Sequence, residues 1–437
     1  MRIAAFALLF PACAASAPEM LDVPTWLTRT AIPLADEARA FREFEDCLEG
    51  VRVVALGEAT HGQHESFERK RALTMHLVRH AHVRLVAYEA SSSSALAADA
   101  YVSGASDDLA AAMSGLGMLV WQVEENAAFL ADLRAWIPDA DPGDRVRFVG
   151  IDVQDPAATA GRIGTLLGGD GALEKRLADW GARIEPAIQK LWTGDASGYH
   201  ALAAEVVALD AEVRAAAEAR GRPVPEIDKR LGELRGALEM HDSPGGRDRA
   251  MAQMLLDELA TLPANLRAVV WAHNGHVTRG PLRYLEIDET GVGGHVAASI
   301  GDAYYALGFA FGEGEFQANA KGADDRFGFR TYSLSPAPEG SLESVQRQAC
   351  DGDFLLDLRG APRLGPVADW LAAGHGQRWF GGYGMPDDCD AATRDAASLI
   401  ATVPRVDYDG TLFLARTTAA WPRDRSRILR APTSSGS

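Results

Sequence analysis

The sequence is poor in cysteine and in familiar catalytic motifs. Only four cysteines occur in 437 residues, and no two have the close spacing of a zinc site or a thioredoxin-like motif. There is no Gly-x-Ser-x-Gly elbow, no His-Glu-x-x-His, no phosphate loop ending in Gly-Lys-Ser/Thr, and no Gly-x-Gly-x-x-Gly after the first expected strand. These absences disfavour the corresponding serine hydrolases, zinc peptidases, nucleotide hydrolases and dinucleotide enzymes.

Positive charge is also scarce. The chain has 43 Lys and Arg against 61 Asp and Glu, a formal net charge of -18. Neither nucleic acid nor an anionic membrane surface would be attracted to such a protein. We therefore expect a small-molecule substrate that is neutral or cationic, and we expect no nucleic-acid partner. The 47% of hydrophobic residues is ordinary for a globular protein with a large core, and the oligomeric state does not follow from these values.

Long apolar runs are missing except at the N-terminus. There, Met1-Arg2 precedes an apolar run from Ile3 to Ala12 and small residues through Ala17, which is the layout of a secretory signal peptide. The run is too short to span a bilayer. We expect residues 1–17 to be a signal peptide and the protein to be periplasmic or secreted, with a lipid anchor at Cys13 as the alternative.

Removal of a signal peptide would leave three cysteines. Cys350 and Cys389 flank one C-terminal segment and are candidates for a disulfide in an oxidising compartment. Cys47 would then be a free, buried thiol.

Strand-like and helical stretches alternate along much of the chain. The clearest strand candidates are residues 51–56, 83–88, 146–151 and 266–272, followed by 303–311, 354–358 and 411–415. Strands that alternate with helices indicate right-handed crossovers and a mostly parallel sheet. We therefore predict the α/β class, with a mostly parallel central sheet flanked by helices.

One long region breaks this alternation. Between Pro156 and Pro263 the strand signal vanishes, and Ala-, Leu-, Glu- and Arg-rich stretches replace it at 172–192, 199–220 and 227–240. These stretches predict antiparallel helices. The expected domains are the two parts of the α/β core at 18–155 and 264–430, an all-helical subdomain at 156–263 that acts as a lid or a brace, and a disordered tail at 431–437.

Polar titratable side chains follow the ends of the predicted strands. They are Glu58 with His61 in Gly57-Glu58-Ala59-Thr60-His61-Gly62, then Glu89, Asp152, His273 and His276. The carboxyl ends of parallel strands share one edge of a sheet, where open α/β folds bind ligands. Since polar groups at the mouth of an apolar strand cost desolvation energy, this set points to chemistry.

Two chemistries suit such a set. In the first, His61 is a general base on water, Glu58 or Glu89 holds its imidazole, and His273 and His276 assist the leaving group or the oxyanion. In the second, these five residues ligate a metal whose bound water is the nucleophile. The spacing permits both, and it also permits simpler readings in which Glu58 caps a helix and Asp152 only fixes its loop.

Several ordered motifs resemble one known family. They are Gly57 to Gly62 with Glu65, Glu89-Ala90, Gly150-Ile151-Asp152-Val153-Gln154, Arg247 to Ala252, Trp271-Ala272-His273-Asn274-Gly275-His276, Tyr304 to Phe309 and Gly312-Glu313-Gly314. In order and spacing this set is similar to the erythromycin esterase family. The resemblance covers most of the chain after the signal peptide.

The resemblance implies an α/β core of the erythromycin esterase/ChaN-like type, with a helical subdomain and a cleft between them. It also implies hydrolysis of a macrolactone ester by histidine-activated water, without a covalent intermediate. We expect no cofactor, with a divalent metal as the alternative. The catalytic residues would be His61, Glu58, Glu89, His273 and His276, and the substrate-binding residues Lys70, Asp152, Arg249 and Asn274.

For two of these residues the expected position in the fold can be stated. Lys70, nine residues after His61, would project from the first crossover helix toward the cleft, and Arg249 would support the site or form a plain ion pair. The rival functions are a metal-dependent hydrolase or transferase acting on an envelope or secondary-metabolite ester, and a haem-binding ChaN-like protein.

Overall fold

A computed structural model describes residues 21–136, 145–169, 171–283, 289–322, 326–382 and 391–429. The predicted signal peptide, Cys13, Cys389 with its proposed disulfide, and the predicted tail at 431–437 lie outside these residues. No helix within the described part of the chain has both the length and the apolarity needed to cross a membrane.

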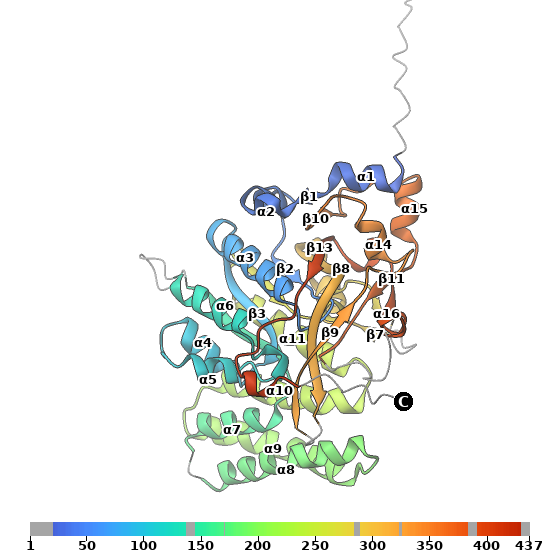
Figure 1. The fold of residues 1–437 in the computed structure, drawn as a ribbon. Coiled ribbons are helices and arrows are strands. Elements are labelled where there is room, and N and C mark those ends of the chain that lie inside the picture. The colour runs from blue at the N-terminus through green and yellow to red at the C-terminus, as the bar shows by residue number, and fades with distance from the viewer. Residues whose placement is uncertain are drawn as a thin grey trace, which may run out of the picture.

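A nine-stranded sheet forms the centre of the molecule (Figure 1). Its strands are β1 (Ile32–Pro33), β2 (Val53–Leu56), β3 (Val83–Ser91), β4 (Arg147–Asp152), β5 (Arg267–Trp271), β8 (Tyr304–Lys321), β9 (Phe327–Leu334), β10 (Phe354–Asp357) and β13 (Gly410–Thr417). The order is β1-β10-β13-β8-β2-β5-β3-β4, and β9 pairs with the far half of β8. Two short ribbons lie outside it, β6 (Pro281–Leu282) with β7 (Glu289–Thr290) and β11 (His375–Arg378) with β12 (Leu399–Thr402).

The sheet is mostly parallel. The six strands β13, β8, β2, β5, β3 and β4 run in one direction, while β1, β10 and β9 pair antiparallel. The α/β prediction is confirmed. All seven predicted strand segments fall in this sheet, because each is an apolar run long enough to be buried on both faces.

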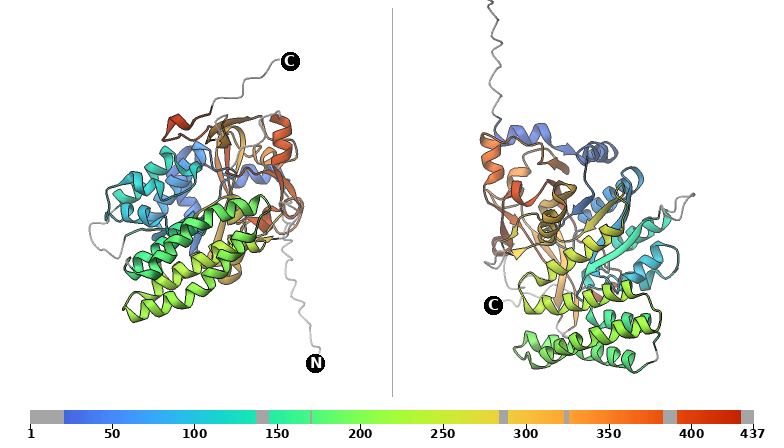
Figure 2. Two further views of the ribbon diagram at one scale, coloured as in Figure 1. Left: turned by 90° about the horizontal axis from the view of Figure 1, so that it is seen from below. Right: turned by 180° about the vertical axis from the view of Figure 1, so that it is seen from behind.

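Helices cover both faces of the sheet (Figure 2). On one face, Val54 and Leu56 of β2 pack in a core with α2 (Glu37–Asp46), α3 (His64–His80) and α6 (Glu124–Ala135). On the other face, Val53 and Ala55 join a second core with α11 (Gly246–Thr261), α13 (Val292–Ile300) and α15 (Pro366–Ala372). Because successive side chains of a strand point to opposite faces of the sheet, those of β2 belong to two different cores.

The remaining helices are short apart from those of the insertion. They are α1 (Val23–Thr30), α4 (Leu96–Val102), α5 (Leu109–Ser114), α12 (Asn274–Val277), α14 (Leu342–Gln346), α16 (Ala391–Ser398) and α17 (Pro404–Asp407).

The long helices between β4 and β5 form a separate layer with its own core. They are α7 (Pro156–Leu167), α8 (Ala172–Trp192), α9 (Ser197–Ala219) and α10 (Val224–Asp242), and Figure 2 shows them side by side. Their apolar faces meet in a third core around Trp180 and Tyr199. The next helix, α11, instead packs on the sheet through Met251 and Leu255. Helix α10 contributes to both cores, with Leu234 in the third and Ala237 in the second.

A buried polar cluster ties α10 to the end of β3. The carboxylate of Glu233 accepts hydrogen bonds from Ser93 N and Ser93 Oγ at 2.9 and 2.7 Å, and it pairs with Arg230 at 2.9 Å. Arg230 in turn donates to Ser92 Oγ at 2.7 Å. The serine run after β3 therefore binds helix α10 of the helical layer. Ser93, which makes two of these bonds, is four residues after Glu89 in the sequence.

We predict that Glu233→Ala destabilises the protein strongly, because the buried guanidinium of Arg230 then keeps only the partly exposed Glu226, and Ser93 loses its acceptor. Loss of one partner of a buried pair costs about 3–5 kcal/mol. The control is Glu212→Ala, which removes an exposed partner of Arg176 on the same layer and is expected to cost less than about 1 kcal/mol. Urea unfolding followed by circular dichroism measures both, and equal losses would contradict the assigned role.

Candidate active site

Side chains from four parallel strands meet at one edge of the sheet. Glu58 follows β2, Glu89 lies in β3, Asp152 ends β4 and His273 follows β5. All four are at least 96% buried. The structure thus brings together the acids and bases that the sequence placed at this edge.

The first cluster is centred on Glu58. Its Oε1 lies 2.5 Å from His61 Nδ1, and its Oε2 accepts from the ammonium of Lys70. Burial would raise the pKa of Glu58, but the charges of Lys70 and His61 outweigh burial and the pKa is lowered. Glu58 is therefore a carboxylate that fixes the His61 ring from the Nδ1 side.

Two glycines let this loop pass through crowded surroundings. A Cβ on Gly57 would overlap the side chain of Asn274, and one on Gly62 would overlap the carbonyl of Gln317. The backbone of Gly62 is held there, because Gln317 N donates to Gly62 O at 2.9 Å. The glycines that bracket the Glu58 to His61 segment are thus a steric requirement of the site.

Lys70 lies beneath this cluster rather than in a cleft. Its side chain is 1% exposed, and its Nζ lies 4.7 Å from the centre of the Trp271 ring. Burial lowers the pKa of Lys70, and the carboxylate of Glu58 opposes that shift. The structure places the ammonium against Glu58 from the protein side, and the binding of substrate by Lys70 stays a prediction.

The second cluster surrounds Glu89. Its Oε2 accepts from His273 N at 2.9 Å, and its Oε1 lies 2.9 Å from Arg247 Nη2 and 3.3 Å from His276 Nε2. Arg247 also reaches both oxygens of Asp152, at 3.1 and 2.6 Å. Although burial would raise the pKa of Glu89, His276 and Arg247 hold it well below its usual range.

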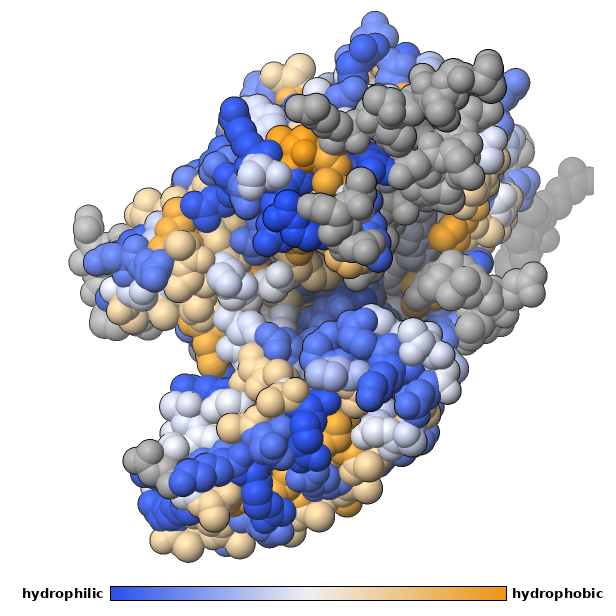
Figure 3. Space-filling model, turned by 60° about the horizontal axis from the view of Figure 1, so that its bottom comes forward, coloured by the Kyte–Doolittle hydropathy of each residue, from blue (hydrophilic) through white to orange (hydrophobic). Residues whose placement is uncertain are grey.

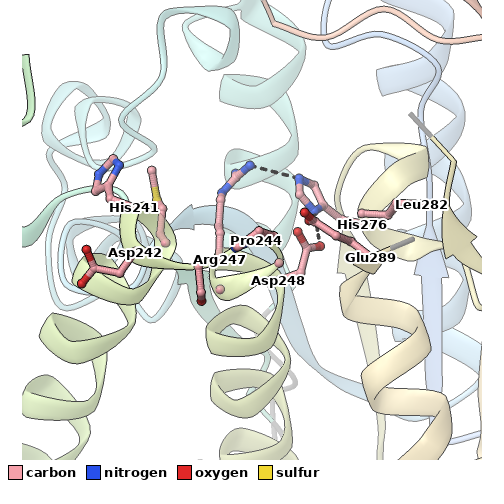
Figure 4. Close-up of a pocket in the computed structure, with 12 residues that line it drawn as sticks. His241, Asp242, Pro244, Arg247, Asp248, His276, Leu282 and Glu289 are labelled. Atoms are coloured by element: carbon pink, nitrogen blue, oxygen red, sulfur yellow. Dashed lines mark hydrogen bonds and ion pairs between the residues drawn. The ribbon is translucent and has the colours of Figure 1, made fainter. Parts of the chain in front are cut away.

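His276 is the cationic histidine of the site. Its Nδ1 lies 2.7 Å from Asp248 Oδ1, and Asp248 also accepts from Val292 N. Burial would lower the pKa of His276, but Asp248 and Glu89 raise it to about 10. Figure 4 shows His276 between Asp248 and Arg247.

His273 is the neutral histidine. Its Nδ1 accepts from Gly275 N at 3.2 Å, and its Nε2 lies 3.1 Å from the carbonyl of Phe380. Burial, and then the neighbouring His61, lower its pKa to about 3. With Nδ1 accepting and Nε2 donating, both ring nitrogens are used by the protein, so His273 shapes the wall of the site.

A cavity of about 520 Å³ opens onto these clusters. Its polar wall contains His61, Glu89, Arg247 and His276, and its apolar wall contains Met118, Leu119, Leu282, Phe327 and Trp379. Because Nδ1 of His61 is held by Glu58, Nε2 is the nitrogen that this ring offers to the cavity. Figure 3 shows the recess between the helical layer and the sheet-bearing part of the molecule.

A second cavity, of about 480 Å³, adjoins the first across Arg247 and His276 (Figure 4). Both side chains line both cavities. The pair thus lies between the cavity that contains His61 and a space bordered by the start of α11.

Two predicted binding residues are engaged elsewhere. Arg249 is 42% exposed and pairs with Glu239 at 2.8 Å, which is the plain ion pair of the sequence analysis. The side chain of Asn274 exchanges two hydrogen bonds with the backbone of Phe309, at 2.7 and 2.9 Å. Asn274 therefore joins α12 to β8.

The sequence analysis assigned no role to Arg247 or to Asp248, which both contact His276. The signal was present in the phase of α11, since Met251, Leu255 and Leu259 follow at intervals of four and are buried against the sheet. Arg247 is one interval earlier on the same face, whereas Arg249 is not.

The chain belongs to the erythromycin esterase family, whose model matches residues 78–417. The Glu58 to His61 loop precedes the matched segment. An erythromycin esterase type II from Escherichia coli is 29% identical over 109 residues, which cover 24% of this chain and 26% of that protein. The match thus spans about a quarter of the curated relative.

Solved structures of similar fold cover nearly the whole chain. A protein from Bacillus cereus has a TM-score of 0.72 at 21% identity, covering 92% of this chain and 98% of that one. A succinoglycan biosynthesis protein gives 0.71 at 17%, with the same coverage. A mutant of the erythromycin esterase EreC in its open conformation gives 0.66 at 17%, covering 90% and 97%. At these identities the likeness establishes the fold.

We predict that two site histidines differ widely in charge. His276 should stay protonated up to about pH 9 and His273 neutral down to about pH 4, because their pKa values are displaced to about 10 and about 3. The stability that His276 contributes is then full below about pH 6.5 and declines as the pH rises toward 10. Nitrogen-15 NMR of histidine-labelled protein measures both charges.

Assignment of these signals uses His276→Gln and His273→Gln, each of which should remove one of the two outlying resonances. If all histidine signals titrate between pH 6 and 7, the electrostatic assignment of the site is wrong.

Proposed function

We propose that this protein hydrolyses a carboxylic ester, and that the ester is a macrolide lactone. The observation that carries the proposal is the His61 ring, with Nδ1 held 2.5 Å from an ionised Glu58 and Nε2 left to the cavity. Family membership supports ester hydrolysis, and the curated relative bears the name of an erythromycin esterase.

In the proposed reaction His61 acts as a general base. Its Nε2 takes a proton from water while the water oxygen attacks the acyl carbon, and Glu58 stabilises the imidazolium that forms. When the bond from carbon to the ester oxygen breaks, the same proton passes to the departing alkoxide. The described residues that line the cavity include no Ser, Thr, Cys or Lys, and the proposed reaction has no covalent intermediate.

Arg247 and His276 supply positive charge on the cavity wall. Both are fixed by carboxylates, Arg247 by Asp152 and His276 by Asp248. Fixed charges stabilise a tetrahedral oxyanion without reorganisation during the reaction. We assign these two side chains to that role, with Glu89 holding them in place.

The alternative of a metal-bound nucleophile fits the donor set less well. Both oxygens of Glu58 are occupied by His61 and Lys70, and Glu89 is already neutralised by two cations. Among the described residues, no group of three or more His, Cys, Asp or Glu side chains is arranged to hold a metal ion. We therefore propose a reaction at the residues of the chain itself.

We also propose a location outside the cytoplasm, because residues 1–17 have the layout of a signal peptide.

We predict that a macrolide panel incubated with the protein yields at least one product heavier by one water, detected by mass spectrometry. His61→Asn should reduce that turnover by at least about a thousandfold, because the base is lost while the Nδ1-side hydrogen bond is kept. His375→Asn, outside the cavity, is the control and should retain parental turnover. Parental turnover in His61→Asn would refute the mechanism.

We also predict that Lys70→Met shifts the acid limb of the kcat/KM profile to higher pH. With the ammonium removed, burial of Glu58 is less opposed, so its pKa rises and its carboxylate is lost earlier as the pH falls. Activity at pH 7 should fall at least about tenfold.

The matched control is Lys70→Arg, which keeps the charge and should leave the acid limb where it is. Thermal unfolding followed by circular dichroism verifies that both variants are folded. An unchanged acid limb in folded Lys70→Met would show that Lys70 does not set the charge of Glu58.

A further inference from the structure

A short segment that follows β11 forms one wall of the site. In this segment, residues 379–382, the side chain of Trp379 and the two glycines Gly381 and Gly382 line the same cavity as His61. A Cβ on Gly382 would lie only 3.3 Å from Cδ2 of His61. The ring that is proposed to activate water is therefore in contact with this segment.

The backbone of the segment is also hydrogen-bonded to the site. Phe380 N donates to the carbonyl of Ala59 at 2.7 Å, and Ala59 is two residues before His61. The carbonyl of Phe380 accepts from His273 Nε2 at 3.1 Å. The rings of His61 and His273 have their centres 5.1 Å apart. A displacement of the segment would therefore move the surroundings of both rings.

Arg378, the last residue of β11, anchors the segment in the core. Its buried guanidinium binds both oxygens of Asp395, at 2.8 and 2.9 Å, and it donates to the carbonyls of Gly312 and Ser335, both at 2.6 Å. The backbone N of Arg378 donates to Glu343 Oε1 at 2.8 Å. Glu343 thus holds the backbone of the residue from which the segment starts.

Glu343 lies on α14, beside β11 (Figure 1), in surroundings that favour its neutral form. Its side chain is fully buried, and its Oε2 has no hydrogen-bond partner among the described residues. The amide oxygen of Gln346 is likewise buried without a partner there. Residues three apart on a helix share a face, so a proton on Oε2 turns two unpaired acceptors into a donor and an acceptor.

The charged groups around Glu343 do not cancel the effect of burial. Burial raises the pKa of Glu343 to about 7, although the hydrogen bond from Arg378 N and the charge of Arg378 oppose the shift and Asp395 adds to it. Tyr408 also senses this charge, but burial raises its pKa and it stays neutral. On β8, Glu313 is held in an ion pair of its own. The carboxyl group is therefore neutral in mildly acidic solution and ionises as the solution becomes alkaline.

We propose that Glu343 is a positioning residue of the active site, which holds residues 379–382 against His61 and His273 when it is uncharged and loosens them when it ionises. The effect on turnover rests on the proposed ester hydrolysis, to which it adds a regulation of the same site by pH.

The physical reason is the cost of the ionised form. A charged Glu343 shares the guanidinium of Arg378 with Asp395 and has one oxygen without a donor. Entry of water or an outward turn of the side chain relieves the cost of a buried carboxylate in that position. Either change weakens the bond to Arg378 N. The active arrangement is therefore lost as the pH rises above about 7.

The first test is the pH profile of turnover. The kcat for the macrolide that the panel identifies is measured between about pH 6 and pH 9. In the parent it should fall at least about fivefold, with a midpoint near 7. Glu343→Gln keeps an acceptor for Arg378 N and cannot ionise, so it should remove this alkaline limb.

Two further variants separate positioning from a general effect on folding. Glu343→Leu removes the acceptor at every pH and should lower kcat at least about fivefold even at about pH 6, with a much smaller change in KM. Glu339→Gln changes an exposed glutamate in the connection before α14 and should keep the parental profile. Circular dichroism verifies that each variant is folded.

The second test does not depend on activity. The Nε2 resonance of His273 in nitrogen-15 histidine-labelled protein reports the bond to the carbonyl of Phe380. His273 itself does not titrate near neutral pH, because burial lowers its pKa to about 3. We expect a shift with a midpoint near 7 in the parent that is absent from Glu343→Gln. A shift common to both proteins comes from other neighbouring groups and is subtracted.

The outcomes separate the two proposals. Identical pH profiles or identical His273 titrations in the parent and in folded Glu343→Gln would overturn the role of Glu343 and leave ester hydrolysis in place. A parent without an alkaline limb near pH 7 would do so whatever the variants show. If no macrolide is hydrolysed, the proposed function fails, and the His273 titrations alone determine whether Glu343 positions the site.

Discussion

Two buried carboxylates constrain the rest of this structure, because each needs a cationic partner. Glu58 and Glu89 are each about 1% exposed or less, and an ionised carboxylate in such surroundings is tolerable only beside positive charge. Lys70 supplies this positive charge to Glu58, and Arg247 and His276 supply it to Glu89. The result is a pair of fixed negative charges, each orienting a histidine toward one cavity.

The fold can be understood as the means of bringing those cations to the sheet edge. Lys70 comes from α3, which packs on one face, and Arg247 comes from the first turn of α11, which packs on the other. The helical insertion is thus connected to the chemistry by its final helix. The cluster of Glu233 with the serine run holds the preceding helix to β3, close to Glu89. This cluster thereby connects the helical layer to the strand that carries Glu89.

Strand positions and the convergence at the sheet edge followed from the sequence, because apolar runs and strand ends are local signals. The sequence did not show which cationic side chain pairs with which buried carboxylate. Arg247 and Arg249 differ only in helical phase, and the choice becomes evident once the buried face of α11 is known. The burial of Lys70 and the backbone bonds of Asn274 depend on contacts between segments distant in sequence, which local patterns do not encode.

The strand order has a consequence for how the chain reaches this state. Strand β5 lies between β2 and β3, although more than two hundred residues of sequence separate β2 from β5. Strand β2, which precedes Glu58, and β3, which carries Glu89, therefore cannot join one continuous sheet until residue 271 has been synthesised and β5 has paired with both. Such late, long-range pairing slows folding and leaves apolar strand edges exposed meanwhile. The core of the helical layer, by contrast, is made by helices that follow one another in the sequence, so its contacts do not depend on that late pairing.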